Sequence, residues 1–547
     1  RLNVMTNAAV RLGARAGNAT LNLAAMNQGV SMAATGDVRA HATGDLHLVD
    51  VSGTNVTLAS ATGDIGANRV DVAGNYSLAG RSFYNGALQP LGGRAGIWTL
   101  TSSAGLDALG QTLEFGGDID FTVAGTFENG RGRSLPGAVT VSASALDLYQ
   151  IPAATGIDVQ AVAGDLDLFL ADTAAGNLTL TGGTVRVSGS LEGGADVTVN
   201  ATTGDAVIGY VTAGRNIAIT GHGDATLRQA NLTGATGDLT IRGGGNAVLG
   251  DDDALSGIGT DRWFERAAGS TGTATITGGT GAFVNLDHSA KLDNVGAGQV
   301  AINVATGDLA VGQLTATADG ISVDVANGSL TMGSASAANG TLDLYADGDL
   351  TLLGGASALE VYLTAGGLLD TRTAPVSGTD YVELTGGEIR AGTIGSGGDI
   401  DALSTSGAIA ADAVHSTGGD AIFNAFNDLN LGSVIANGGQ LQAGGNAAVR
   451  AITAPDGFAL VALGNVTLGA DTAGLVTGSN LLVTGGSLSG CACGSGGAAL
   501  ISLGGNVSVN LQSVTGVFDT IASAIGGDAT VHVATGDLGI GDLAGHN

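Results

Sequence analysis

Apolar and polar residues alternate over short stretches of this chain, each beginning with Gly followed by Asp or Asn. Gly164–Leu168 reads Gly-Asp-Leu-Asp-Leu, Gly348–Leu352 reads Gly-Asp-Leu-Thr-Leu, and Gly464–Leu468 reads Gly-Asn-Val-Thr-Leu. Alternation with a period of two predicts a short β-strand with one buried face. Because Gly tolerates positive φ and Asp or Asn can bond the backbone two residues on, the pair predicts a corner before each strand.

These corners recur at a nearly constant spacing. Asp205 and Asp224 are 19 residues apart, and Asp399 and Asp420 are 21 residues apart. Strands this short, without an intervening helical pattern, favour neither a broad hairpin sheet nor βαβ crossovers. We therefore predict an all-β fold, a parallel β-helix (β-solenoid) of about 19–21 residues per coil, with loop excursions from the coils.

The regularity of the repeat divides the chain into five predicted segments. Residues 1–80, 153–249 and 271–547 are regular β-solenoid, and the last segment continues to an uncapped end. Residues 81–152 form an irregular solenoid with aromatic-rich excursions, and residues 250–270 form an acidic loop or short helix inserted between coils. Loops held on a rigid scaffold often carry binding residues, so we expect function there.

Composition excludes several classes of protein. The chain has 96 Gly but only 5 Pro in 547 residues, which excludes collagen, and 44% hydrophobic residues, which argues against disorder. Acidic residues outnumber basic ones 49 to 19, giving a net charge of −30, so nucleic acid is not an expected partner. No apolar run reaches the roughly 18 residues of a membrane-spanning helix.

An acidic cluster in the predicted insertion is the candidate metal site. Asp251, Asp252, Asp253 and Asp261 supply hard oxygen ligands of the kind that Ca²⁺ prefers. The spaced acidic loop of an EF-hand is absent, so a solvated loop remains the alternative. Calcium is the only cofactor that the sequence suggests.

Asp-x-Asp pairs raise the question of catalysis. Asp165 with Asp167, and Asp399 with Asp401, would place two carboxylates on one strand face, as in polysaccharide-cleaving enzymes. These pairs belong to the repeating corners, whereas an active site is normally unique. We therefore expect no catalytic residues and no enzyme activity.

Two further features leave alternatives open. Cys491 and Cys493 are the only cysteines, and a disulfide across a single residue would be strained, so oxidised, reduced and intermolecular states all remain. Arg1–Val4 resembles neither a translation start nor a signal peptide, so we expect a segment of a longer protein.

The Gly-Asp-Leu-Thr-Leu phrase and its period resemble the filamentous haemagglutinin-like exoproteins of bacterial two-partner secretion systems, over most of the chain. The resemblance implies a right-handed β-helix exported by an outer-membrane transporter of a Gram-negative bacterium. It also implies a secreted, extracellular or outer-membrane-surface location. The expected role is an adhesin or filament shaft that binds host or bacterial surface glycans or proteins, or supports a biofilm.

Three functional hypotheses follow. The first is a non-catalytic shaft of a secreted surface adhesin. The second is a structural surface-layer or filament subunit that self-associates through solenoid ends or sides, since unpaired strand edges favour such contacts. The third is a polysaccharide-acting β-helix enzyme.

Overall fold

The chain divides into two compact units, Arg1–Thr280 (unit 1) and Gly281–Asn547 (unit 2), in a computed structural model. The described residues form strands and turns and contain no helix. They are residues 2–3, 10–14, 17–23, 26–85, 98–102, 106–113, 119–132, 138–250, 263–267, 271–454, 456–468, 476–477, 480–485, 488–490, 497–502, 507–511, 520–524, 528–533 and 542–544. The five predicted segments stay predictions.

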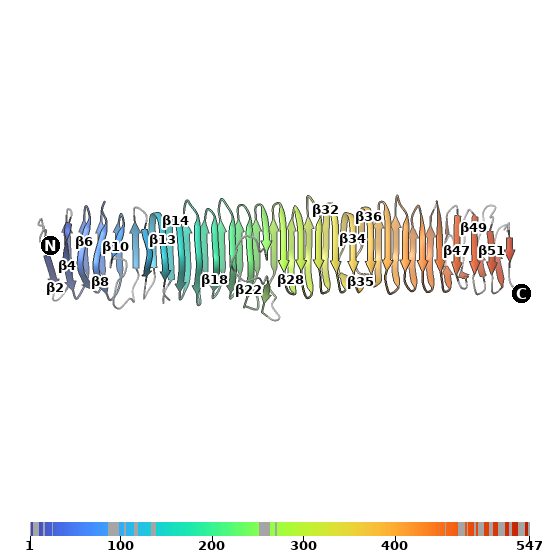
Figure 1. Cartoon of the computed structure of the whole chain (residues 1–547), viewed down its shortest axis with the longest axis horizontal. Helices are drawn as coiled ribbons and strands as arrows, with labels where there is room; N and C mark the ends of the chain where they lie inside the picture. Colours follow the sequence, from blue (N-terminus) through green and yellow to red (C-terminus); the bar gives the residue numbers. More distant parts are fainter. Residues whose placement is uncertain are drawn as a thin grey trace. The chain divides into compact units, whose positions relative to one another are not determined.

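Unit 1 consists of short parallel strands (Figure 1). They are β1 (Leu2–Asn3), β2 (Val10–Ala14), β3 (Ala19–Leu23), β4 (Met26–Ala34), β5 (Val38–Ala42), β6 (Leu46–Gly53), β7 (Val56–Ser60), β8 (Ile65–Val72), β9 (Tyr76–Gly80), β10 (Phe83–Asn85), β11 (Trp98–Ser102), β12 (Leu106–Leu113), β13 (Ile119–Gly132), β14 (Ala138–Ala153), β15 (Gly156–Ala161), β16 (Leu166–Thr173), β17 (Leu178–Gly182), β18 (Val185–Gly193), β19 (Val197–Ala201), β20 (Ala206–Ala213), β21 (Ile217–Gly221), β22 (Ala225–Leu232), β23 (Leu239–Gly243), β24 (Asn246–Leu249), β25 (Phe264–Arg266) and β26 (Ala274–Gly278).

Unit 2 is built in the same way. Its strands are β27 (Gly281–Leu286), β28 (Ala290–Ala297), β29 (Gln299–Val304), β30 (Leu309–Ala316), β31 (Ile321–Val325), β32 (Leu330–Ala346), β33 (Leu350–Leu352), β34 (Ala356–Ala365), β35 (Leu368–Thr371), β36 (Val376–Gly386), β37 (Glu388–Ser396), β38 (Asp399–Ser404), β39 (Ile409–Ser416), β40 (Ala421–Ala425), β41 (Leu429–Ile435), β42 (Gly438–Ala443), β43 (Ala447–Thr453), β44 (Gly457–Ala462), β45 (Val466–Leu468), β46 (Val476–Thr477), β47 (Asn480–Gly485), β48 (Leu488–Gly490), β49 (Gly497–Ser502), β50 (Val507–Leu511), β51 (Thr520–Ala524), β52 (Ala529–Val533) and β53 (Asp542–Ala544).

Most strands pair in parallel with the second strand along the chain, so most coils add one strand to each of two ladders. In unit 1 the ladders include β15–β17–β19–β21–β23 and β14–β16–β18–β20–β22. In unit 2 they include β35–β37–β39–β41–β43 and β36–β38–β40–β42–β44. This topology confirms the predicted all-β parallel β-solenoid, while its right-handedness stays a prediction.

The strand register gives the coil length directly. Leu178 pairs with Val197 and Val197 with Ile217, which are steps of 19 and 20 residues. The next step, from Ile217 to Leu239, is 22 residues. The predicted period is therefore confirmed as an average, and single coils depart from it by a residue or more.

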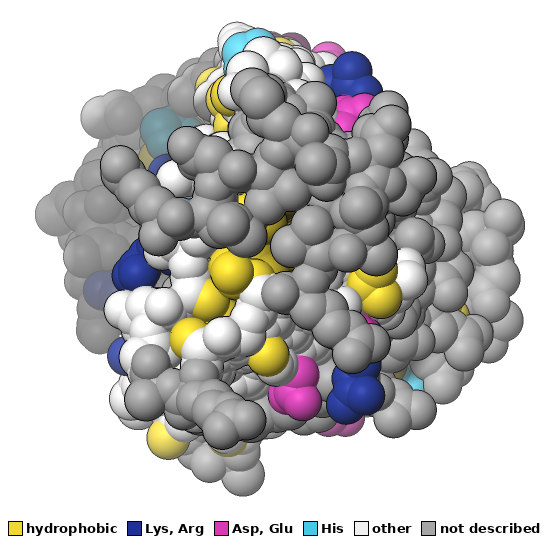
Figure 2. All heavy atoms as spheres, turned by 90° about the vertical axis from the view of Figure 1, so that its left-hand side faces the viewer, with side chains coloured by type: hydrophobic (Ala, Val, Ile, Leu, Met, Phe, Trp, Pro, Cys, Tyr) yellow, Lys and Arg dark blue, Asp and Glu magenta, His cyan; other side chains and the backbone are white. Residues whose placement is uncertain are grey.

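Alternation along each strand places aliphatic side chains in the core. In β17, Leu178 and Leu180 are fully buried, whereas the threonines between and after them face outward. The register stacks these inward positions from coil to coil, so removal of apolar surface from water stabilises the stack at roughly 25 cal/mol per Å². Figure 2 shows hydrophobic side chains toward the middle of unit 1, with charged side chains around them.

Longer strands bend around this core at register shifts. Between β16 and β18 the pairing shifts between Leu168 and Ala171, and between β18 and β20 it shifts between Val187 and Ser190. An extra residue in one strand of a pair bends that strand locally. The bend allows one eight- or nine-residue strand to follow two sides of a coil.

Buried hydroxyl groups satisfy backbone groups at the corners. Ser416 is buried, its Oγ donates to the Gly398 carbonyl at 2.7 Å, and it accepts the Gly419 N–H at 3.0 Å. Thr371 differs, because its fully buried Oγ1 has no hydrogen-bond partner. A buried polar group without a partner keeps the full cost of its desolvation.

We therefore expect Thr371→Val to raise the free energy of unfolding by about 1 kcal/mol, because valine keeps the shape and removes the unpaired oxygen. Ser416→Ala is the matched control and should lower it by about 1–3 kcal/mol, since two backbone groups would lose their partner. Urea denaturation followed by circular dichroism measures both. Equal destabilisation by the two substitutions would contradict this account.

Candidate functional site

The corners of unit 1 are joined by side chains that reach from one coil to the next. Asp205 Oδ1 accepts the backbone N–H of Asp224 at 2.8 Å, and Asp224 Oδ1 accepts that of Asn246 at 2.7 Å. We call such a series a corner ladder. At these corners the bond runs from coil to coil, rather than to the backbone two residues on as the sequence pattern predicts.

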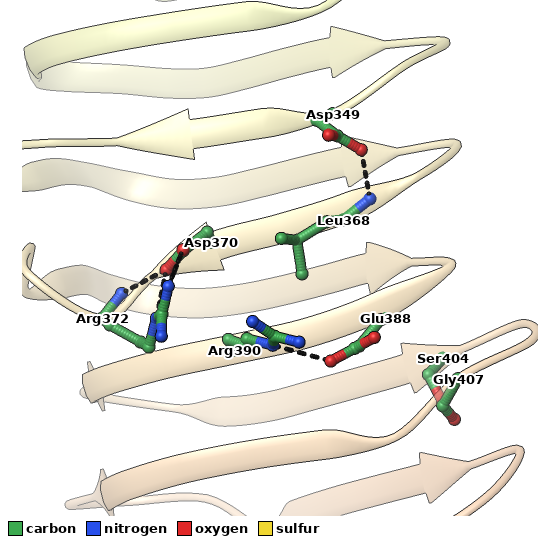
Figure 3. Close-up of polar contacts among 8 residues, drawn as sticks. All are labelled: Asp349, Leu368, Asp370, Arg372, Glu388, Arg390, Ser404 and Gly407. Atoms are coloured by element: carbon green, nitrogen blue, oxygen red, sulfur yellow. Dashed lines mark hydrogen bonds and ion pairs between the residues drawn. The ribbon is translucent and has the colours of Figure 1, made fainter.

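Unit 2 has the same arrangement. Asp308 Oδ1 accepts the N–H of Ser329 at 2.9 Å, and Ser329 Oγ accepts that of Asp349 at 3.2 Å. Asp349 Oδ1 then accepts the N–H of Leu368 at 2.7 Å (Figure 3). Asp, Asn and Ser can alternate in this position because each side chain carries an oxygen that can accept a hydrogen bond.

The same ladder explains several of the glycines that precede a corner residue. A Cβ at Gly419 would overlap Oδ1 of Asp399 and the backbone of the coil before it. Positive φ accounts for only some of these glycines, such as Gly17 and Gly307 at 89° and 88°. At Gly419, close approach of two coils excludes a side chain.

Gly419→Ala should therefore lower the free energy of unfolding by about 1–3 kcal/mol, the usual cost of overpacking. Gly395→Ala is the control within unit 2, because the nearest atoms to a Cβ there lie 4.0 Å away and its φ is not positive. That variant should be neutral or more stable by about 0.4–1 kcal/mol. Urea denaturation measures the free energy of unfolding of both variants. A similar decrease in both would show that crowding between coils does not cause the destabilisation of Gly419→Ala.

The predicted metal ligands Asp251, Asp252, Asp253 and Asp261 lie outside the described residues. The cysteine motif at 491–493 also lies outside them. Across the described part of the chain, no group of three or more His, Cys, Asp or Glu side chains could hold a metal ion. The calcium hypothesis stays a prediction.

Two of the Asp-x-Asp pairs, Asp165 with Asp167 and Asp399 with Asp401, divide between a corner and an outward face. Asp165 Oδ1 accepts the N–H of Thr184 at 2.9 Å, whereas Asp167 lies 3.9 Å from Arg186 Nε. Asp399 similarly accepts the N–H of Asp420 at 2.8 Å. The first carboxylate of each of these pairs thus accepts a hydrogen bond of a corner ladder. This agrees with the expectation that the pairs belong to the repeat.

Of the predicted insertion at residues 250–270, the structure describes residue 250 and residues 263–267, which include β25. Phe264 of β25 pairs with Ala230 of β22, and Arg266 lies over the Phe264 ring with its guanidinium carbon 5.1 Å from the centroid. Trp263 makes an edge contact with Tyr210, with centroids 5.6 Å apart. Residues 263–266 therefore pack against the neighbouring coil of unit 1.

An outward face of unit 2 combines tyrosines with carboxylates. The Tyr362 and Tyr381 rings lie 5.6 Å apart, and the Tyr381 hydroxyl donates to Asp401 Oδ2 at 2.5 Å. The same hydroxyl lies 3.4 Å from Glu383 Oε2, while the Tyr362 hydroxyl donates to Glu360 Oε2 at 3.2 Å. We call these five residues the tyrosine–carboxylate face.

Burial and neighbouring carboxylates raise the pKa values of both tyrosines on this face. Burial raises the pKa of Tyr381, and its hydrogen bond to Asp401 raises it further. Burial also raises the pKa of Tyr362, with its hydrogen bond to Glu360 acting in the same direction. The other oxygen of Asp401, Oδ1, is buried without a partner, so this carboxylate depends on the tyrosine hydroxyl.

Tyr381→Phe tests this coupling through pH. At neutral pH the variant should be less stable by about 1–2 kcal/mol, because Asp401 loses its donor. The pKa of a tyrosine in the unfolded chain is about 10, which is below the raised pKa of Tyr381 in the fold. The free energy of unfolding of the wild type therefore falls as the pH rises above about 10. Phenylalanine does not titrate, so the variant does not lose stability in this way. The difference in free energy of unfolding between wild type and Tyr381→Phe should therefore become smaller between about pH 9 and pH 11.

Denaturant midpoints across this pH range measure the effect. Tyr345→Phe, at an exposed tyrosine of the same unit, is the matched control and should keep the wild-type pH dependence. A constant gap between wild type and Tyr381→Phe would contradict the coupling.

Unit 1 carries a separate pair of exposed aromatic side chains. The Tyr149 and Phe169 rings stack with centroids 4.9 Å apart and an interplanar angle of 12°, and each residue is 41% exposed. Sequence reasoning missed both aromatic pairs. Comparing outward positions one period apart would have found them, since 149 and 169 differ by 20 and 362 and 381 by 19.

No protein-family model, curated protein or solved structure matches this chain. Among the residues that the structure describes, none forms a helix long and apolar enough to cross a membrane.

Proposed function

We propose that this chain is part of the non-catalytic shaft of a secreted bacterial surface adhesin. The observation that carries the proposal is the corner ladder, which repeats in both units with the same donor and acceptor groups. Each coil is bonded to its neighbours, so such a scaffold can be extended coil by coil. Its outward positions then remain for attachment to surface glycans or proteins.

The resemblance to two-partner secretion exoproteins supports export through an outer-membrane transporter of a Gram-negative bacterium. Coils that need only the preceding coil as a template suit folding as the chain emerges outside the cell. The proposed location is therefore extracellular or at the outer-membrane surface.

Bead adhesion tests the attachment role. Beads coated with the folded chain should adhere to bacterial or host cells several times more often than beads coated with urea-unfolded chain, because the outward faces exist only in the fold. Equal adhesion by both preparations would contradict the proposal.

Two measurements address the alternative functions. Periodic filaments of purified chain in electron micrographs, without adhesion of coated beads, would favour a structural surface-layer or filament subunit. Release of reducing ends from a polysaccharide mixture would favour the enzyme hypothesis and overturn the non-catalytic assignment.

A further inference from the structure

The aromatic pair of unit 1 is both stacked and exposed to solvent. One face of Phe169 stacks on Tyr149, and each of the two residues is 41% exposed, so part of the stacked pair is open to solvent. These two residues come from β14 and β16, adjacent strands of one ladder, whose parallel register holds them side by side. The stack is therefore a fixed part of the coil surface.

The next coil leaves room for this ring. Gly189 of β18 follows Phe169 along the ladder, and a Cβ there would lie 3.3 Å from Phe169 Cε2 and overlap the Phe169 carbonyl oxygen. The Phe169 ring thus lies beside bare backbone. A ligand can therefore approach the exposed part of this ring without displacing a side chain of residue 189.

Charged side chains border the stack in the same strands. Asp147 and Asp167 pair in register two residues before Tyr149 and Phe169, and Arg186 pairs with Asp167 in the following coil. The Arg186 and Asp167 side chains are 51% and 56% exposed, so they remain open to a ligand. Together they offer carboxylate acceptors and guanidinium donors beside an aromatic surface.

We propose that Asp147, Tyr149, Asp167, Phe169 and Arg186 form a binding platform for a neutral, hexose-containing polysaccharide. One face of a pyranose ring carries C–H bonds that pack on the electron-rich face of an aromatic ring. Its hydroxyl groups project around the ring edge, where carboxylates and a guanidinium form charge-assisted hydrogen bonds. The inference rests on the proposed function, for which it names the receptor class.

The surroundings favour a glycan over a hydrophobic protein partner. Protein interfaces have an apolar core depleted of charge. Apart from this aromatic pair, Val162 is the one exposed large hydrophobic residue in the described part of unit 1. Two carboxylates against one guanidinium also disfavour an acidic polysaccharide.

Native gel electrophoresis through neutral polysaccharides tests the platform. The probes are mannan, dextran, amylopectin and xyloglucan, with polygalacturonate as the acidic comparison, and titration calorimetry of the retarding glycan then gives Kd. Tyr149→Ala and Phe169→Ala should each raise Kd by about tenfold, whereas Phe169→Tyr should retain binding. Phe426→Ala removes an exposed aromatic residue of unit 2 and is the matched control, with unchanged Kd.

Melting curves of each variant establish that the fold is retained. Lack of retardation by every neutral probe, retardation by polygalacturonate alone, or equal Kd for Phe169→Ala and wild type would each overturn the platform. Bead adhesion separates the two proposals. If coated beads adhere to cells but the chain binds no neutral glycan, the platform is contradicted and the adhesin proposal is not. If the beads do not adhere and no glycan is bound, both proposals are contradicted.

Discussion

Hydrogen bonding between equivalent positions of successive coils is the constraint on which both units depend. Backbone N–H and C=O groups must be paired when they are removed from water, and parallel neighbours satisfy them along the strands. At the corners the flanking backbone groups still pair from coil to coil, but the N–H of the corner residue bonds to a side-chain oxygen of the preceding coil, such as Asp224 Oδ1. Each coil is therefore a template for the one beside it.

The same constraint explains why Gly and Asp occur together. The acceptor side chain of one coil lies where a Cβ of the next coil would be, as between Asp399 and Gly419. At Gly419 the glycine is required by the neighbouring coil rather than by its own backbone angles. Because inward positions are filled by aliphatic residues and corners are fixed by the ladder, chemical variety is left to the outward positions.

Outward residues become neighbours through the coil period. Tyr149 and Phe169 meet in unit 1, and Tyr362 and Tyr381 meet in unit 2, because each pair is separated by one coil. These contacts create aromatic pairs at particular places on the surface, which a strictly uniform repeat would not have. Burial and hydrogen bonding then alter the acidity of these groups, since both raise the pKa of Tyr381 beside Asp401.

The sequence by itself determined the parallel β-solenoid, its average coil length and the corner role of residues such as Asp165, because alternation and spacing are local properties. Only the tertiary structure decided which oxygen accepts which N–H and which outward side chains touch. Individual coils vary, for instance 19 residues from Leu178 to Val197 and 22 from Ile217 to Leu239, so an average period does not fix the register. The Tyr381–Asp401 hydrogen bond depends on that register, since a shift of one residue moves a side chain to the opposite face of its strand.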